Sequence, residues 1–312
     1  MLLLKKIVLF TVVLNILFLP ACSKNPEPEA KLPGEPSAGR DPEKLEDLDV
    51  VYADVLNEDG ETGLKMDIYY PTGAAREKSP LLVGFHGGGW IAGDKSQIIF
   101  MFGPIIEKLR ENGYTVATVQ YRYASDEAPF PSQAEDCARA VSYLIDNAEK
   151  YFIDPDRIGV IGYSAGAQLA MLTSYAYGLD IKYCLSFAGP SKMYGEELGE
   201  YSMSMRSLFE YLFGGPYSEK ESEYIQGSPY YYIDKTENKA PLLLAHDEYD
   251  DVVPFGQSRK MYEKTVEAGI FCELLVLGGF YHQINFNSNY YGQNPETEKF
   301  VDTILNFIYK YS

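Results

Sequence analysis

Residues 157–170 read RIGVIGYSAGAQLA: an apolar run of strand length ends at a serine between glycines, and small helix-forming residues follow. This order of strand, tight turn and helix is the context in which a serine side chain is held out as a nucleophile. The turn strains the serine backbone, so the residues two positions away must be small, as Gly162 and Gly166 are. The Gly-x-Ser-x-Gly pattern is short enough to arise by chance, and Ser164 would then be only a small residue in a tight turn. Partners elsewhere in the chain have to decide between these two interpretations.

Apolar runs of strand length alternate with segments of helical period on both sides of this stretch. The predicted strands span 48–56, 64–71, 81–87, 115–121, 157–163, 181–189, 241–247 and 272–279. The predicted helices span 96–112, 132–150, 164–177, 256–269 and 295–310. The first two strands should pair antiparallel, whereas continuous apolar strands that alternate with helices indicate a parallel sheet covered on both faces. The sequence therefore predicts an α/β fold, doubly wound around a mostly parallel sheet of about eight strands.

Residues 190–235 interrupt this alternation, because they separate two predicted strands by more chain than a crossover helix needs. The segment carries eight of the chain's 27 tyrosines. A long insertion after a sheet strand is where a lid or a substrate wall would be built. The alternative is a structural elaboration that only packs its own aromatic side chains, and the sequence favours neither interpretation.

The first 21 residues have the features of a secretory signal, with two lysines and an apolar stretch, and Cys22 follows directly after a small residue. This arrangement resembles a bacterial lipoprotein signal; the alternative is an ordinary signal peptide with a chance cysteine. The expected location is therefore the bacterial cell envelope, on the periplasmic or outer-membrane surface, with a lipid at Cys22 as the membrane anchor. Residues 22–46 are rich in proline and acids and predict a solvated tether. The catalytic domain is then expected over 47–312.

Composition limits the partners that the chain can take. The net charge of −18 argues against nucleic acid as a ligand. Only three histidines are present and no Cys-x-x-Cys pair occurs, so neither a metal site nor a cofactor site is expected. The remaining cysteines lie in apolar segments and are expected to be buried thiols: Cys137, Cys184 and Cys272.

A nucleophilic serine needs hydrogen-bond donors for the oxyanion that its attack creates. The stretch HGGGW (86–90) follows the apolar run at 81–87. A run of glycines lets backbone N–H groups point into a pocket without obstruction by side chains. A flexible glycine loop is the alternative, but the position directly after a predicted core strand favours a donor loop.

The serine also needs a base, and the chain offers three histidines. His86 belongs to the glycine loop, and His246 lies within or at the end of an apolar strand, where a structural role is expected. His282 follows the last predicted strand and leaves room for an acid between itself and Ser164, in the order serine, acid, histidine.

The acid that orients this histidine should lie in the stretch HDEYDDVVPF (246–255). Its candidates are Asp247, Glu248, Asp250 and Asp251. Asp247 comes too early, because it is still on the predicted strand. Asp250 and Asp251 both fit the loop, and position alone leaves the choice between them open.

Five stretches together resemble the α/β-hydrolases of the esterase and lipase type. They are HGGGW (86–90), YRYA (121–124), FPSQAEDCARAV (130–141), DPDRIGVIGYSAGAQLA (154–170) and HDEYDDVVPF (246–255). The chain is most similar to the branch of hormone-sensitive-lipase-like esterases and bacterial feruloyl- and acetyl-esterase-like proteins. The matching motifs span about residues 64–310 and occur in the family's order.

This resemblance assigns roles to further residues. The family's acid stands four residues after the histidine of a His-Gly-x-x-Asp-x-x-Val-Pro motif, which implies Asp250, although Asp247 stands here in place of the motif's glycine. Tyr163 stands where the hormone-sensitive-lipase group often has aspartate, which points to the feruloyl- and acetyl-esterase-like branch. The oxyanion donors implied by the resemblance are the backbone amides of Gly88, Gly89 and Ala165.

The sequence thus predicts a serine carboxylesterase in which Ser164 attacks, His282 transfers the proton and Asp250 orients His282. The expected substrates are esters of small acyl groups, acetyl or feruloyl, on carbohydrate or on related small molecules. One alternative is a serine peptidase of the same fold, although such enzymes usually carry a large extra propeller domain for which this chain has no room. The other is a surface-binding homologue without turnover.

Overall fold

The computed structural model describes residues 43–56, 60, 62–72, 78–287 and 296–312. The predicted signal peptide (1–21), Cys22 and the tether up to residue 42 lie outside the described residues. In the part of the chain that is described, no helix is both long and apolar enough to cross a membrane.

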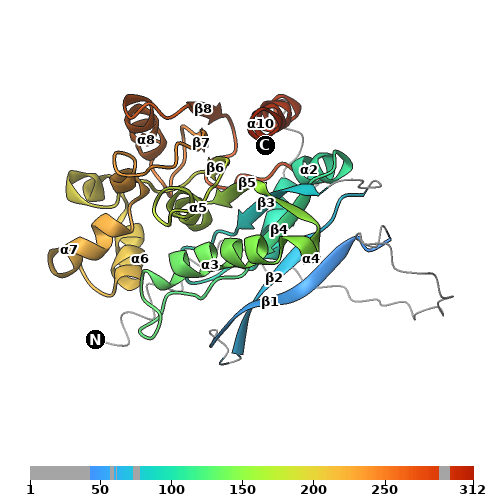
Figure 1. Cartoon of the computed structure of the whole chain (residues 1–312). Helices are drawn as coiled ribbons and strands as arrows, with labels where there is room; N and C mark the ends of the chain where they lie inside the picture. The colour runs from blue at the N-terminus through green and yellow to red at the C-terminus, as the bar shows by residue number, and fades with distance from the viewer. Residues whose placement is uncertain (1–42, 57–59, 61, 73–77, 288–295) are drawn as a thin grey trace. The chain divides into compact units, whose positions relative to one another are not determined.

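Eight strands form one sheet in the order β1-β2-β4-β3-β5-β6-β7-β8 (Figure 1). The strands are β1 (Glu46–Leu56), β2 (Thr62–Tyr69), β3 (Ser79–Phe85), β4 (Thr115–Val119), β5 (Ile153–Tyr163), β6 (Tyr183–Phe187), β7 (Leu242–Asp247) and β8 (Cys272–Leu277). The pairs β1–β2 and β2–β4 are antiparallel, and the strands from β4 to β8 are parallel. The predicted mostly parallel sheet is therefore confirmed, including its antiparallel pair at one edge.

Helices cover both faces of this sheet. They are α2 (Ser96–Glu111), α3 (Ser132–Asp146), α4 (Ala148–Tyr151), α5 (Ala165–Tyr175), α6 (Met203–Phe213), α7 (Tyr217–Gln226), α8 (Gly256–Glu267) and α10 (Thr297–Tyr311). Figure 1 shows α2 and α10 together on one side, with α3, α5 and α8 on the other. Apolar residues of α2 and α10 form one buried cluster with the facing side of the sheet. The doubly wound α/β fold is confirmed.

The central strands are buried along their whole length, as their continuous apolar sequences predict. Helix α5 is also buried at every residue, because its alanines and Gly166 let it lie close to the sheet. Cys137, Cys184 and Cys272 are buried free thiols. The described residues contain no group of histidine, cysteine, aspartate and glutamate side chains that could hold a metal ion.

The segment 190–235 folds into two short 3₁₀ helices, Gly195–Glu200 and Pro229–Tyr232, with α6 and α7 between them. Four of its aromatic side chains are buried: Tyr201, Phe209, Phe213 and Tyr224. The Phe213 and Tyr224 rings lie 4.2 Å apart, and the Tyr201 and Phe209 rings lie 4.8 Å apart. The segment thus packs its own aromatic residues, as one of the two interpretations expects.

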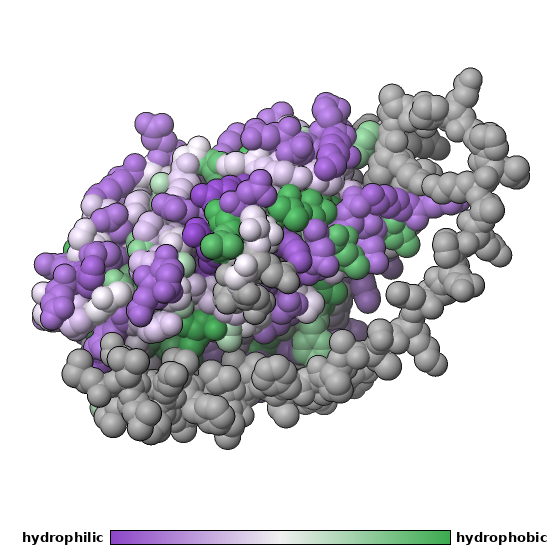
Figure 2. Space-filling view, turned by 90° about the horizontal axis from the view of Figure 1, so that it is seen from below, coloured by the Kyte–Doolittle hydropathy of each residue, from purple (hydrophilic) through white to green (hydrophobic). Residues whose placement is uncertain are grey.

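The face of the molecule seen in Figure 2 is mainly hydrophilic where the described residues are visible. Its apolar side chains lie in small separate groups. This surface is what a chain with a net charge of −18 is expected to present.

Candidate active site

Three residues from three separate loops form a continuous hydrogen-bonded line at the carboxyl ends of the parallel strands. Ser164 follows β5, Asp250 follows β7 and His282 follows β8. The Ser164 Oγ lies 3.0 Å from His282 Nε2, and His282 Nδ1 lies 2.7 Å from Asp250 Oδ2. The structure therefore brings together all three residues that the sequence proposed as nucleophile, base and acid.

Ser164 sits in a strained turn. Its backbone has φ 53° and ψ −119°, a region that residues with a side chain rarely occupy. Its N–H donates to the carbonyl of Phe187 at 2.8 Å, which ties the turn to β6. A Cβ atom added at Gly162 would lie 2.0 Å from the Gly166 carbonyl oxygen, and one at Gly166 would lie 2.1 Å from the Phe85 carbonyl oxygen. Both glycines of the Gly-x-Ser-x-Gly pattern are therefore sterically required.

Asp250 is a buried carboxylate with a full set of donors. Its Oδ1 accepts the backbone N–H groups of Val252 and Val253, both at 2.9 Å. Burial alone would raise the pKa of Asp250, but the hydrogen bonds from His246 and His282 outweigh burial and hold its pKa well below the usual range. Asp250 is therefore an ionised acceptor, so His282 Nδ1 carries a proton and Nε2 offers its lone pair to the Ser164 hydroxyl. The other candidate, Asp251, is exposed on the loop.

His246 has a role that the sequence did not reveal. It is buried at the end of β7, and its Nε2 lies 3.1 Å from Asp250 Oδ2 and 3.0 Å from the Val253 carbonyl oxygen. Because both neighbours only accept, Nε2 must be the donor, and Nδ1 then accepts the Ser258 hydroxyl at 2.7 Å. His246 thus orients the acid, as the spacing of four residues between His246 and Asp250 could have suggested.

The glycine loop at residues 86–90 follows β3 directly. Gly88 and Gly89 have φ values of 113° and 59°, which favour glycine. A Cβ at Gly88 would lie 2.0 Å from the Ala92 carbonyl oxygen. Ala165 is the first residue of α5, so its backbone N–H lies at the N-terminus of that helix. The amides of Gly88, Gly89 and Ala165 stay the predicted oxyanion donors.

The loop is held by buried side chains and is not merely a flexible glycine run. The Tyr121 hydroxyl donates to the His86 carbonyl at 2.9 Å, and the Tyr121 and His86 rings stack 4.2 Å apart. Burial lowers the pKa of His86 to about 4, so His86 is neutral near pH 7. Trp90 Nε1 donates to Gln168 Oε1 at 3.0 Å, and Gln168 Nε2 donates to the Gly227 carbonyl at 2.6 Å. The carboxamide of Gln168 therefore joins the loop, α5 and the insertion.

Helix α6 forms a wall beside this loop. A Cβ at Gly89 would lie 3.2 Å from Leu208 Cδ1, and the Trp90 and Phe209 rings lie 5.9 Å apart. Helix α6 therefore takes part in the aromatic packing of the insertion and also lies beside the predicted oxyanion donors.

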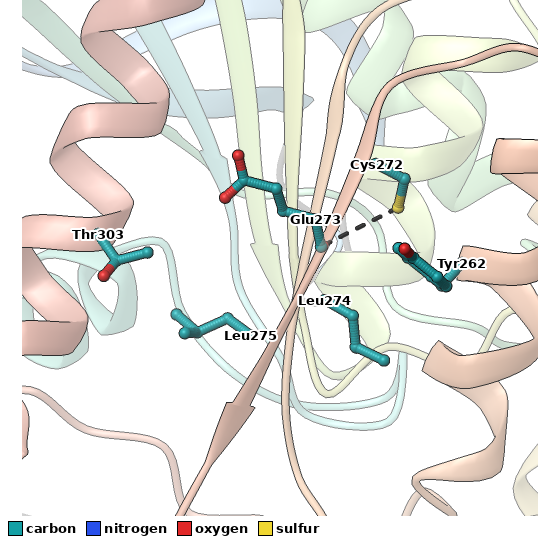
Figure 3. Close-up of a pocket in the computed structure, with 6 residues that line it drawn as sticks. All are labelled: Tyr262, Cys272, Glu273, Leu274, Leu275 and Thr303. Carbon is teal, nitrogen blue, oxygen red and sulfur yellow. Dashed lines mark hydrogen bonds between the residues drawn. The ribbon is translucent and has the colours of Figure 1, made fainter.

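A depression of about 280 Å³ lies away from the triad, between α8, β8 and α10. Figure 3 shows the side chains of Tyr262, Cys272 and Thr303 around it. Burial raises the pKa of the Cys272 thiol to about 12, so this depression offers no reactive nucleophile near pH 7.

Comparison with known proteins indicates the family of this chain. The BD-FAE family model matches residues 66–265. The versiconal hemiacetal acetate esterase of Dothistroma septosporum is 29% identical over 217 residues, which are 67% of this chain and 62% of that protein. The esterase 2 of Thermogutta terrifontis phosphoramylated by tabun is 25% identical with a TM-score of 0.68, over 87% of this chain and 97% of that one.

A truncated carbohydrate esterase from gut microbiota has a TM-score of 0.70 at 19% identity, over 88% of this chain and 98% of that one, and shows the same fold. Because the family model covers more than half of the sequence, this chain belongs to the BD-FAE family and is an α/β-hydrolase of the esterase class.

Proposed function

We propose that the protein is a serine carboxylesterase that works through an acyl-enzyme at Ser164. Its preferred substrates are esters of small acyl groups, acetyl or feruloyl, on carbohydrate or on related alcohols. The observation that carries the proposal is the unbroken line from Ser164 Oγ through the His282 ring to Asp250, with contacts of 3.0 and 2.7 Å.

The reaction begins when Ser164 Oγ attacks the ester carbonyl carbon while His282 Nε2 takes the hydroxyl proton. Asp250 holds the Nδ1 proton of His282 and stabilises the imidazolium that forms. The carbonyl oxygen becomes an oxyanion, which backbone amides stabilise. These amides belong to Gly88, Gly89 and Ala165.

Collapse of this intermediate breaks the bond to the alcohol, which leaves with the proton from His282. Water then attacks the acyl-Ser164 ester while His282 takes a proton from the water. The second collapse frees the carboxylic acid and returns the proton to Ser164 Oγ. The hydrogen bonds that keep the pKa of Asp250 low also keep it ionised, so it can support His282 throughout the cycle.

Features of the site support a short acyl group and a ring-shaped alcohol. Leu208 and Phe209 pack directly against the glycine loop, which narrows the space beside the oxyanion donors. Tyr249 and Tyr281 are 67% and 58% exposed and stand next to the acid and the base in the chain, where aromatic faces could stack on a sugar ring. The acetate esterase among the relatives and the carbohydrate esterase among the similar folds are consistent with this choice.

The decisive variant is Ser164→Ala. It should lower the release of p-nitrophenol from p-nitrophenyl acetate by at least about 10⁴-fold, since loss of a triad nucleophile removes the covalent route. A fluorophosphonate probe should label the native protein and fail to label this variant. Full activity in Ser164→Ala would refute the proposal, and a native protein that neither turns over nor takes the probe would favour the surface-binding alternative.

The substrate class needs its own comparison. Rates on acetylated xylan, methyl ferulate and p-nitrophenyl esters of rising chain length should favour the short acyl esters and the acetylated polysaccharide. A rate that rises steadily up to long acyl chains would contradict the carbohydrate assignment, and cleavage of peptide substrates at a comparable rate would favour a peptidase.

We also propose that Cys22 carries a lipid that attaches the enzyme to the cell envelope. The support is the sequence of residues 1–22 alone. Metabolic labelling with a fatty acid should mark the expressed full chain and should not mark Cys22→Ser. Equal labelling of both proteins would contradict the lipid anchor.

A further inference from the structure

We infer that two residues outside the triad, Asp247 and Tyr163, hold the backbone around His282 and act as positioning residues for its ring. The inference rests on the proposed function, because it concerns the base of that reaction. Neither side chain belongs to the hydrogen-bonded line of Ser164, His282 and Asp250.

Asp247 is the last residue of β7, and its side chain is fully buried. One of its oxygens, Oδ2, accepts the backbone N–H groups of Phe280 at 2.7 Å and Tyr281 at 2.8 Å. The other, Oδ1, accepts the N–H of Tyr249 at 2.8 Å. One carboxylate therefore joins the loop that carries the acid to the loop that carries the base.

The Asp247 carboxylate links the two loops beyond the point where the sheet ends. The last paired residues of β7 and β8 are Asp247 and Leu277, so ladder hydrogen bonds stop five positions before His282. Beyond that point, the two loops have to be held by side chains. A glycine at position 247, as in the family motif that this stretch resembles, could not make these bonds because it has no side chain.

Backbone strain at Tyr281 shows why the histidine loop needs such support. Tyr281, directly before His282, has φ 52°, a conformation that residues with a side chain adopt only when their surroundings enforce it. Its N–H is one of the groups bound by Asp247. Hydrogen bonds that backbone N–H groups donate to a carboxylate are among the stronger ones in proteins, so they can stabilise this conformation.

Tyr163 holds the same loop from the side of the nucleophile. Its hydroxyl donates to the backbone carbonyl of His282, and the two rings lie 5.4 Å apart. The Tyr163 ring is itself confined, because a Cβ atom at Gly87 would come within 2.7 Å of Tyr163 Cδ1. The residue directly before Ser164 is therefore bonded to the histidine that Ser164 needs.

Asp247→Asn tests this inference with little change in shape. In either orientation of the new amide, its NH₂ group replaces an oxygen that accepted at least one backbone N–H. Two donors then face each other, and that hydrogen bond is lost. A displacement of about 1 Å in a catalytic group can cost about 10²-fold in rate, so we expect kcat on p-nitrophenyl acetate to fall roughly 10- to 100-fold with KM within about threefold. Asp251→Asn, on the exposed part of the same loop, is the matched control and should keep the native kcat.

A double-mutant cycle separates positioning from general damage. If Asp247 acts through His282, Asp247→Asn should cause no further loss of residual turnover in a His282→Ala background. An undiminished loss in that background would overturn the inference, as would a native kcat in Asp247→Asn. Loss of activity in Ser164→Ala together with a native kcat in Asp247→Asn would refute this inference while leaving the proposed function in place.

Tyr163→Phe gives a second and independent test, because it removes one hydroxyl and keeps the ring packing. We expect kcat to fall roughly 3- to 30-fold, again without effect in the His282→Ala background. Circular dichroism melts should show that Tyr163→Phe is folded at the assay temperature. A native kcat in folded Tyr163→Phe would remove Tyr163 from the positioning group.

Discussion

Gln168 offers a quantitative test of the way the glycine loop is held. The change Gln168→Leu keeps a side chain of similar size in the buried site on α5 and removes both of its hydrogen bonds. It leaves the Trp90 indole N–H and the Gly227 carbonyl without their partners at 3.0 and 2.6 Å. Each buried polar group left unpaired costs about 1–3 kcal/mol.

The two unpaired groups should therefore lower the free energy of unfolding by about 2–6 kcal/mol. At about 2–4 °C per kcal/mol, such a loss lowers Tm by roughly 4–24 °C. Because total stabilities are about 5–15 kcal/mol, kinetics are measured at a temperature at which circular dichroism shows the variant folded. Because Trp90 adjoins Gly88 and Gly89, kcat/KM should fall as well, through misplacement of the predicted oxyanion donors.

Urea denaturation followed by circular dichroism measures the stability, and hydrolysis of p-nitrophenyl acetate measures kcat/KM. Gln226→Leu is the matched control, since Gln226 is exposed on α7 and, among the residues that the structure describes, its side chain bonds only to the Ser222 hydroxyl one turn earlier. A loss of less than about 0.5 kcal/mol in Gln168→Leu, equal to an ordinary surface change, would refute the reasoning.

Two further predictions concern His86 and the strained turn that carries Ser164. The pKa of buried His86 is about 4 in the folded protein, and its ordinary value is 6.5. Between pH 4 and pH 6.5, His86 therefore binds a proton in the unfolded chain but not in the folded one. Stability should then fall by roughly 3 kcal/mol as the pH drops from 7 to 4, and His86→Asn should flatten that part of a urea-denaturation pH series; an unchanged slope would contradict the assignment. Gly166→Ala places a Cβ atom 2.1 Å from the Phe85 carbonyl oxygen, so it should abolish fluorophosphonate labelling of Ser164 or prevent folding, whereas a folded, fully labelled variant would contradict the steric argument.

Much of the fold could be predicted because buried strands and buried helix faces are apolar in sequence. Strand β3 was predicted at 81–87 and lies at Ser79–Phe85, and α8 was predicted at 256–269 and lies at Gly256–Glu267. The helix predicted at 132–150 instead breaks at Asn147, whose φ of −109° and ψ of 22° are not helical. The apolar period continues across this break, so periodicity alone could not reveal it.

The start of β5 was missed for a related reason. Residues 153–156 contain a proline and two aspartates, which do not read as a strand. They belong to β5 because Ile153 pairs with Ser79 at the start of β3, a contact between distant parts of the chain. Tertiary pairing here overrides local preference.

The candidate site was predictable as far as its chemistry depends on side-chain type. Ser164 and His282 follow from local patterns. Asp250 and Asp251 are equivalent by position, and only the family motif, in which the acid stands four residues after His246, favours Asp250. Burial is what distinguishes the two, and one sequence does not display it. The bonds of Asp247 and Tyr163 to the histidine loop reach backbone groups 33 to 119 positions away, and backbone atoms carry no sequence signature.

The contact of Leu208 with the glycine loop has a consequence for how this enzyme can change. In the proposed reaction, Leu208 and Phe209 border the acyl group and also pack beside the predicted oxyanion donors. Under that proposal, changes at these two residues alter substrate preference and catalytic rate together. A library that varies Leu208 and Phe209 to admit larger acyl groups should yield variants whose broader range comes with slower turnover. Compensating changes are then expected around the buried Trp90 and Gln168, whose hydrogen bond holds the glycine loop.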